Sequence, residues 1–198
     1  MNRRSRFGFQ HWIAVGFAVF QAFNLSYPAH QGGTAIRDTA GHPFNPFEHD
    51  KGKVIVLVFT CIDCPISNAY APKIRRLCEE FADSGIVFLL VHCDPDESLE
   101  AIENHRKEFL YPCAALFDPG HELVRRAQAH VTPEAAVFRP DGTLVYHGRI
   151  DNQYVEFGKR RPEATQEDLK LVLKAVTEGH PPQIKSSRAI GCSVASLK

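Results

Sequence analysis

The chain has 198 residues and a formal net charge of zero, because 23 lysines and arginines balance 23 aspartates and glutamates. Hydrophobic residues make up 44% of the chain and charged residues 23%, which is typical of a soluble globular protein with one sizeable core. Without a basic surplus, nothing in the net charge favours binding to nucleic acid or to an anionic membrane surface. We therefore expect one main domain and no nucleic-acid partner.

The N-terminus differs in composition from the rest of the chain. Three arginines among the first six residues precede a stretch without acidic residues over 7–25, whose uninterrupted apolar centre is 12–20. This centre has the length of a signal-peptide apolar region and is short for a membrane span. We predict a signal peptide or signal anchor with its linker over residues 1–33, and an exported domain in the periplasm or another extracytoplasmic space. An uncleaved leader would anchor the protein in the membrane through residues 7–25, and a disordered or amphipathic tail is the alternative.

The first predicted elements are a loop, a strand, a helix and a second strand. Residues 45–53 are polar and predict a loop, whereas 54–60 form a continuous apolar run typical of a strand buried on both faces. From residue 65 to about residue 82, apolar side chains recur at spacings of three and four, which predicts a helix with Pro72 inside it. Residues 86–92 predict another buried strand.

The second half of the chain continues the alternation of helices and strands. The predicted elements are a charged helix over 97–110, a short apolar run over 113–117, a short helix over 122–129, hairpin strands over 135–138 and 143–146, and an amphipathic helix over 166–178. Alternation implies parallel pairing with right-handed crossovers, and the hairpin adds antiparallel strands. The sequence thus predicts an α/β domain over residues 34–178, with a mixed sheet flanked by helices and a C-terminal tail over 179–198.

Cys64 is the strongest candidate for a reactive residue, because it lies between a predicted buried strand and a predicted helix. The N-terminus of a helix has unpaired N–H groups and a partial positive charge, and both stabilise a thiolate. Such a position can lower the pKa of a thiol from about 8.5 to roughly 3.5–7.5. Since the thiolate is the nucleophile, we expect Cys64 to perform the chemistry.

Cys61 forms a Cys-x-x-Cys pair with Cys64, but on an unusual side. In the usual redox pair the second cysteine lies inside the first helical turn, and that position is Ser67 here. Two arrangements stay open: Cys61 and Cys64 form a displaced dithiol, or Cys64 acts alone with Ser67 in the place of a resolving cysteine.

Three further residues complete the set of candidates. A cis bond between Thr132 and Pro133 would bring the backbone close to Cys64, whereas an ordinary trans turn proline is the alternative. Cys192 in the tail could reach Cys64 and resolve it, pair with another chain, or have no role. Cys78 lies on the apolar face of its helix, and we expect it in the core.

Several segments together match a known pattern. They are Gly52–Thr60, Cys64–Asn68, Pro72, His92–Asp96, Val131–Glu134 and Tyr146–Asp151. On these segments the chain resembles the thioredoxin-like superfamily, most closely its redoxin branch, which is related to alkyl hydroperoxide reductase and thiol-specific antioxidant (AhpC/TSA) proteins. The resemblance implies a thioredoxin-like fold, with Cys64 as the nucleophile and Pro133 as the cis-proline. It also implies that Pro65, Ser67 and Thr132 support the active site.

The chain departs from two members of this superfamily. Thioredoxins have a second active-site cysteine where Ser67 stands. Peroxiredoxins carry proline and threonine or serine seven and three residues before the peroxidatic cysteine, where this chain has Leu57 and Cys61.

Together these features predict an extracytoplasmic thiol oxidoreductase in which Cys64 attacks a disulfide or a peroxide, and Cys61 or Cys192 resolves the product. Its partners would be a protein thiol, a protein disulfide or a peroxide as substrate and an external thiol as reductant, and it would need no cofactor. Two alternatives stay open. One is a copper(I) metallochaperone with Cys61, Cys64 and a histidine such as His92 as ligands. The other is a thioredoxin-like binding module without turnover.

Overall fold

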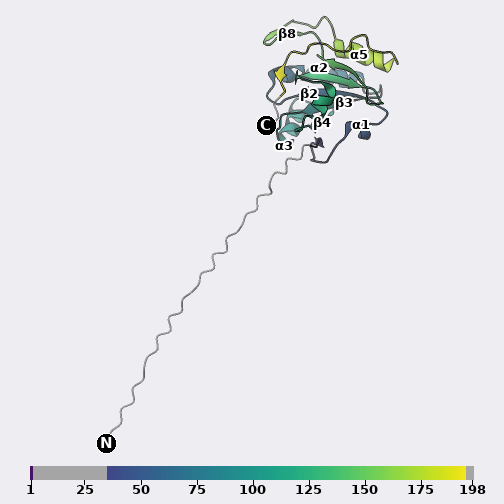
Figure 1. Cartoon of the computed structure of the whole chain (residues 1–198). Helices are drawn as coiled ribbons and strands as arrows, with labels where there is room; N and C mark the ends of the chain where they lie inside the picture. Colours follow the sequence, from purple (N-terminus) through teal and green to yellow (C-terminus); the bar gives the residue numbers. More distant parts are fainter. Residues whose placement is uncertain (2–34, 195–198) are drawn as a thin grey trace. The chain divides into compact units, whose positions relative to one another are not determined.

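A six-stranded mixed sheet forms the centre of the computed structural model, which describes Met1 and residues 35–194 (Figure 1). Its strands lie in the order β1-β4-β3-β2-β6-β7. They are β1 (Arg37–Asp38), β2 (Val54–Thr60), β3 (Ile86–His92), β4 (Ala114–Phe117), β6 (Glu134–Phe138) and β7 (Leu144–Gly148). β2, β3 and β4 pair in parallel, whereas β1, β6 and β7 pair antiparallel with their neighbours. The predicted mixed sheet and α/β class are confirmed.

Helices and short strands surround this sheet. The helices are α1 (Pro46–His49), α2 (Pro65–Glu80), α3 (Leu99–Glu108), α4 (Glu122–Ala127) and α5 (Asp168–Thr177). The short strands are β5 (Val131–Thr132), β8 (Tyr154–Glu156), β9 (Lys159–Arg160) and β10 (Cys192–Ser193), of which β5 pairs with β10 and β8 with β9.

The two faces of the sheet bury separate apolar layers, because side chains alternate along each strand. Val56 and Val58 of β2 pack in a layer with residues of α2, α3 and α5. Leu57 and Phe59 point to the other face and pack with residues of α4. Burial on both faces explains why β2 and β3 were predictable as continuous apolar runs, with the bounds that the structure has.

The loop predicted over residues 45–53 was wrong in part, since it contains helix α1. The side chain of Asn45 caps this helix by accepting a hydrogen bond from the Phe47 amide at 3.1 Å. The Phe47 ring packs edge-on against Phe138 at 5.0 Å between centroids, and the Arg126 guanidinium lies 3.5 Å from its centre. A four-residue helix is too short to show the apolar periodicity that would reveal it in the sequence.

The leader predicted over residues 1–33 lies outside the described residues, apart from Met1. Its roles as a signal peptide, linker or membrane anchor therefore stay predictions. In the part of the chain that is described, no helix is both long enough and apolar enough to span a bilayer.

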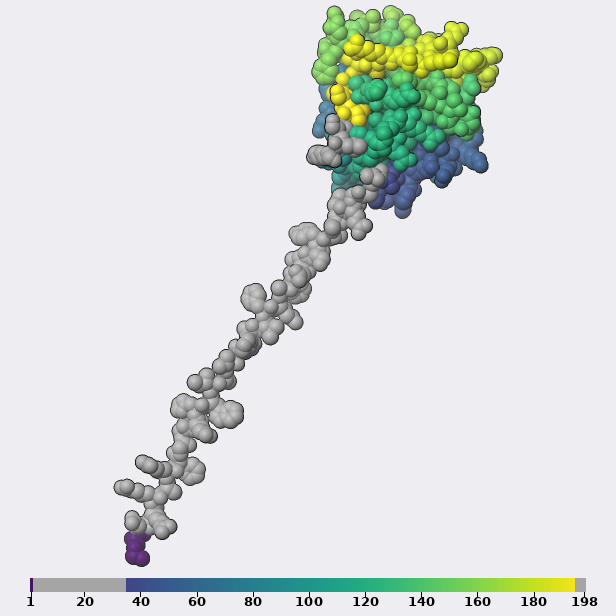
Figure 2. Space-filling model, viewed as in Figure 1, coloured from purple at the N-terminus to yellow at the C-terminus, as the bar shows by residue number. Residues whose placement is uncertain are grey.

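The C-terminal tail packs against the domain as far as it is described, and we call residues 179–194 the C-terminal strap. Its backbone forms two hydrogen bonds of 3.2 Å with His147, at the outer edge of β7. Further along, β10 pairs antiparallel with β5, with Cys192 opposite Thr132. Figure 2 shows the strap, coloured yellow, lying across the surface of the domain. The part of the predicted tail that the structure describes, residues 179–194, is thus packed as part of the fold.

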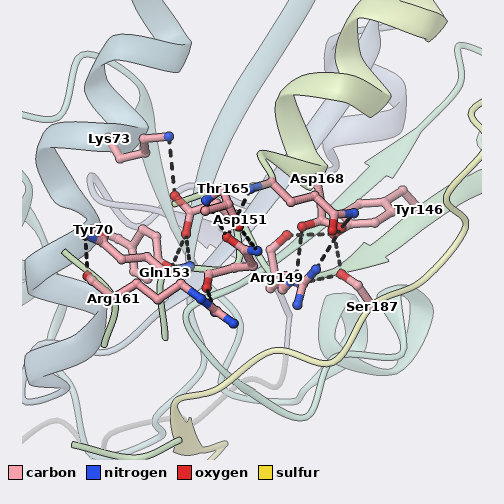
Figure 3. A network of polar contacts seen from close by, with 12 residues as sticks. Tyr70, Lys73, Tyr146, Arg149, Asp151, Gln153, Arg161, Thr165, Asp168 and Ser187 are labelled. Atoms are coloured by element: carbon pink, nitrogen blue, oxygen red, sulfur yellow. Dashed lines mark hydrogen bonds and ion pairs between the residues drawn. The ribbon is translucent and has the colours of Figure 1, made fainter. Parts of the chain in front are cut away.

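A buried polar network links α2 to the segment that follows β7 (Figure 3). The hydroxyl of Tyr70 donates a 2.6 Å hydrogen bond to the buried carboxylate of Asp151. Lys73 adds an ion pair to the same carboxylate at 3.3 Å. A buried carboxylate is stable only when charge and hydrogen bonds compensate its lost hydration. Here the charge comes from α2, and the hydrogen bonds come from α2 and from the Gln153 amide at 2.9 Å.

The same network continues to α5 and to the strap (Figure 3). Asp168, of which 1% is exposed, accepts a 2.8 Å hydrogen bond from the guanidinium of Arg149. The hydroxyl of Tyr146 donates to the Arg149 carbonyl at 2.6 Å and lies 2.7 Å from the hydroxyl of Ser187 in the strap. Ser187 therefore ties the strap to this buried polar network.

We expect Arg149→Met to lower the free energy of unfolding by about 3–5 kcal/mol, because Asp168 would keep its buried charge without a cationic partner. Urea denaturation of the full chain measures this loss. The matched control is Lys159→Met, whose ion pair with Glu156 is exposed on both sides and should change stability by no more than about 0.5 kcal/mol. Equal losses in the two variants would contradict this interpretation of the network.

Candidate functional site

The Cys64 sulfur lies at the junction of β2 and α2, as the sequence predicts. Cys64 is the N-cap residue of α2, and its sulfur accepts a hydrogen bond from the Ser67 amide at 3.4 Å. Pro65 follows at the first helical position, where a missing N–H costs nothing. Only 1% of Cys64 is exposed. The helix thus begins on the thiol itself.

A second segment reaches the sulfur from the loop before β6. The peptide bond between Thr132 and Pro133 is cis, which is the first of the two predicted alternatives. The Cys64 thiol donates a 3.0 Å hydrogen bond to the carbonyl of Thr132. The predicted supporting residues therefore lie close to the sulfur. Ser67 and Thr132 contact it, Pro65 follows Cys64 in the chain, and Pro133 follows Thr132.

The hydrogen bonds that the Cys64 sulfur accepts favour its thiolate form. Burial by itself raises the pKa of the thiol, but the interactions with Cys192, with the Ser67 side chain and with the Ser67 amide outweigh it. Together these interactions lower the pKa of Cys64 to about 7. At neutral pH a large fraction of Cys64 is therefore ionised, which is the state that acts as a nucleophile.

Cys61 has a different environment, although it is only three residues away. Burial, together with the charge and the hydrogen bond of Glu97, raises the pKa of the Cys61 thiol to about 11. Its carbonyl accepts a hydrogen bond from the Cys64 amide at 3.2 Å, which closes a tight turn between the two cysteines. At neutral pH Cys61 is therefore a protonated thiol and a poor nucleophile.

Polar side chains from other elements hold the turn between these cysteines. The Ile62 amide donates to Glu97 at 2.8 Å, and the Ile62 carbonyl accepts from the Asn68 side chain at 2.8 Å. Behind them, His92 lies 2.7 Å from Glu97, and His105 lies 2.8 Å from Asn68. Burial lowers the pKa of His105 to about 4, so its neutral ring donates from Nε2 to the Asn68 side-chain oxygen.

Sequence reasoning did not identify Glu97 or His105 as residues of this site. Glu97 lies 35 residues from its partner Ile62, and His105 lies 37 residues from its partner Asn68. Neither belongs to a recognisable motif, and both lie in the predicted helix over 97–110, whose many charged residues are typical of a helix on the surface. Only the pairing of the strands that precede them brings them to the turn.

The alternative copper ligands Cys61, Cys64 and His92 are not brought together as a ligand set. Among the residues that the structure describes, no three His, Cys, Asp or Glu side chains are arranged to hold a metal ion. The Nδ1 atom of His92 faces Glu97 instead. These residues, as placed, do not fit a three-ligand copper(I) site, and copper binding stays a prediction from the sequence.

Two of the remaining cysteines, Cys192 and Cys78, have different surroundings. Cys192 contacts Cys64, and burial followed by this contact raises the pKa of Cys192 to about 12. Cys78 packs against the apolar core, as expected, and its hydrogen bond with Cys113, followed by burial, raises its pKa. All six cysteines are free thiols in the structure. Cys192 in the tail is thus the cysteine that the fold brings to Cys64, as its predicted resolving role requires.

Comparison with known proteins agrees with this architecture. Residues 21–147 match the AhpC/TSA family, whereas no curated protein matches the chain. An uncharacterized conserved protein from Geobacillus kaustophilus is 24% identical with a TM-score of 0.70, over 82% of this chain and 87% of that one. A hypothetical protein from Sinorhizobium meliloti is 22% identical with a TM-score of 0.69, over 80% and 88%.

A more distant relative has a named activity. A secreted disulfide oxidoreductase from Mycobacterium tuberculosis is 20% identical with a TM-score of 0.52, over 70% of this chain and 92% of that one. At these identities the solved structures are similar to this chain in fold alone. The family match is different, because it extends over more than half of the sequence. With its thioredoxin-like sheet and its cysteine at the start of α2, the chain belongs to the AhpC/TSA family.

Proposed function

We propose that the protein is a thiol–disulfide oxidoreductase in which the Cys64 thiolate attacks a substrate disulfide. The observation that carries this proposal is the position of the Cys64 sulfur at the N-cap of α2, where hydrogen bonds lower its pKa to about 7. A thiol whose pKa lies near the ambient pH is close to the optimum for exchange, because it combines a large thiolate fraction with good nucleophilicity. Membership of the AhpC/TSA family supports the proposal.

The reaction begins when the Cys64 sulfur bonds to one sulfur of the substrate and the substrate S–S bond breaks. This step yields a mixed disulfide on Cys64 and a substrate thiolate, which takes up a proton. The amide of Ser67 stabilises the attacking thiolate before the step, and the same amide favours Cys64 as the leaving thiolate when an external thiol later reduces the oxidised protein.

Peroxide reduction ranks second in this proposal. In peroxiredoxins a proline and a hydroxyl residue precede the peroxidatic cysteine, where this chain has Leu57 and Cys61. Leu57 is buried in the apolar layer of the sheet and offers no polar group to a peroxide. Burial and the interaction with Glu97 keep the Cys61 thiol protonated. We therefore expect slow peroxide turnover compared with disulfide exchange.

We expect the ultraviolet absorbance of the full chain to show one thiolate that forms as the pH rises through about 7, and to lose this transition in Cys64→Ser. Ser67→Ala should shift the transition to higher pH, because the hydroxyl that stabilises the thiolate is removed. Cys61→Ser is the control and should leave it in place. A transition near pH 7 that survives Cys64→Ser would contradict the assignment.

We expect Cys64→Ser to reduce the protein's activity toward insulin disulfides to the rate of uncatalysed exchange, with a dithiol as reductant, because the attacking sulfur is gone. Cys61→Ser should stay near the wild-type rate, since Cys61 is protonated at neutral pH. Cys78→Ser is the matched control on the same helix. Full activity of Cys64→Ser would refute the proposal, and peroxide turnover faster than disulfide turnover would reverse the ranking of substrates.

We also propose that the domain works outside the cytoplasm. The basic N-terminus before a short apolar run supports export, as does the fold shared with a secreted disulfide oxidoreductase. Disulfide chemistry is characteristic of oxidising compartments. A reporter phosphatase that is active only outside the cytoplasm, fused after residue 33, should be active in bacteria. It should become inactive when residues 7–25 are deleted, and an inactive fusion with the intact leader would contradict export.

A further inference from the structure

A single thiolate cannot complete the reduction of a disulfide without a second thiol to release it, and the strap carries one. We propose that Cys192 is the redox partner of Cys64, and that the two cysteines form a reversible intramolecular disulfide. The inference rests on the proposed function, because it assigns the second half of the same reaction.

The first support is the course of the strap backbone at Gly191. A Cβ atom at this position would lie 2.1 Å from the carbonyl oxygen of Thr132, so no residue with a side chain fits without displacement. The next residue, Cys192, is paired with Thr132 in the β10–β5 ladder. The Thr132 carbonyl in turn accepts the hydrogen bond from Cys64 at 3.0 Å. The Thr132 backbone therefore lies against the strap at Gly191 and Cys192 and also against the Cys64 sulfur.

The second support is the contact between the two thiols. Cys192 packs against the apolar cluster that contains Cys64, and the interaction between the two thiols lowers the pKa of Cys64 and raises that of Cys192. Cys61 offers a weaker alternative, because its pKa is raised by burial and by Glu97, which do not change when Cys64 enters a mixed disulfide, whereas Cys64 itself is one of the groups that raise the pKa of Cys192. The strap thus occupies the role that a second cysteine inside the helix has in thioredoxins, where this chain has the buried Ser67.

The charge on Cys64 determines when Cys192 can act as a nucleophile. While Cys64 is a thiolate, its contact and its charge help to keep Cys192 protonated. When Cys64 enters a mixed disulfide, that negative charge is gone and Cys192 loses its proton more readily. Cys192 is therefore a resolving thiol that becomes a better nucleophile only after the first step has occurred.

The complete reaction balances as two successive exchanges. The Cys192 thiolate bonds to the Cys64 sulfur, and the bond between Cys64 and the substrate sulfur breaks. The substrate leaves as a second thiolate, so that both of its sulfurs are reduced and take up the two protons released by Cys64 and Cys192. Cys64 and Cys192 are oxidised together, and an external dithiol returns them to the reduced state by the same exchange chemistry.

Access to Cys64 requires movement of the strap, since only 1% of Cys64 is exposed while Cys192 is seated. The strap is anchored by Ser187, whose hydroxyl contacts Tyr146 and the Arg149 amide. Its far end is paired through β10, which is only two residues long. The strap therefore opens at β10, admits the substrate, and returns Cys192 to the mixed disulfide.

The test is to oxidise the reduced full chain with glutathione disulfide, block free thiols, digest with trypsin and map the peptides by mass spectrometry. Cys61 and Cys64 share the peptide 54–73, whereas Cys192 lies in 189–198. We expect a cross-link between these two peptides that persists in Cys61→Ser. In Cys192→Ser we expect glutathione to accumulate on Cys64 and disulfide turnover to fall. A disulfide within peptide 54–73 in place of the cross-link would overturn the inference.

A second variant tests the geometry while all six cysteines remain. Gly191→Ala should slow formation of the cross-link, because its Cβ displaces the strap from Thr132. Ser193→Ala, an exposed position of the same strand, is the matched control and should form the cross-link at the wild-type rate. Equal rates in both variants would contradict the role of the strap. Glutathione on Cys64 without any cross-link would refute this inference alone, whereas no adduct on Cys64 in any variant would refute the proposed function as well.

Discussion

The hydrogen bond from the Ser67 amide to the Cys64 sulfur ties the beginning of α2 to the candidate chemistry. Because the sulfur serves as the N-cap, the group that begins the helix is also the group that the helix stabilises as a thiolate. The position of α2 follows from β2, whose last residue is buried four positions before Cys64. The two apolar layers of the sheet therefore fix the place of the reactive sulfur through a single short turn.

The two sides of that turn hold cysteines of opposite character. On one side, Thr132 and the strap approach Cys64, and Cys192 of the strap together with Ser67 favours its thiolate. On the other, Glu97 raises the pKa of Cys61, while the same carboxylate secures the backbone of Ile62. Hence the Cys-x-x-Cys spacing does not by itself define the redox pair in this chain. The local charge and the burial of each sulfur decide which one can act as a nucleophile.

Local sequence signals were sufficient to predict the central strands and the position of Cys64 between a strand and a helix. β2 and β3 are uniform apolar runs, and the residue between a buried strand and a helix is the natural place for a reactive thiol. The short helix α1 and the two-residue strand β10 have no periodicity to detect. The roles of Glu97, His105 and Gly191 depend on partners far away in the chain, and neither composition nor spacing reveals which segments a fold brings together.

We propose that Cys64 is the most reactive of the six thiols although it is buried. A competition among all six cysteines tests it directly: the reduced protein is treated at neutral pH with less than one equivalent of iodoacetamide, and the labelled residue is identified by peptide fragmentation. We expect the label to appear first on Cys64, since its pKa is lowered to about 7 while those of Cys61 and Cys192 are raised. Preferential labelling of Cys61 or Cys192 would contradict it.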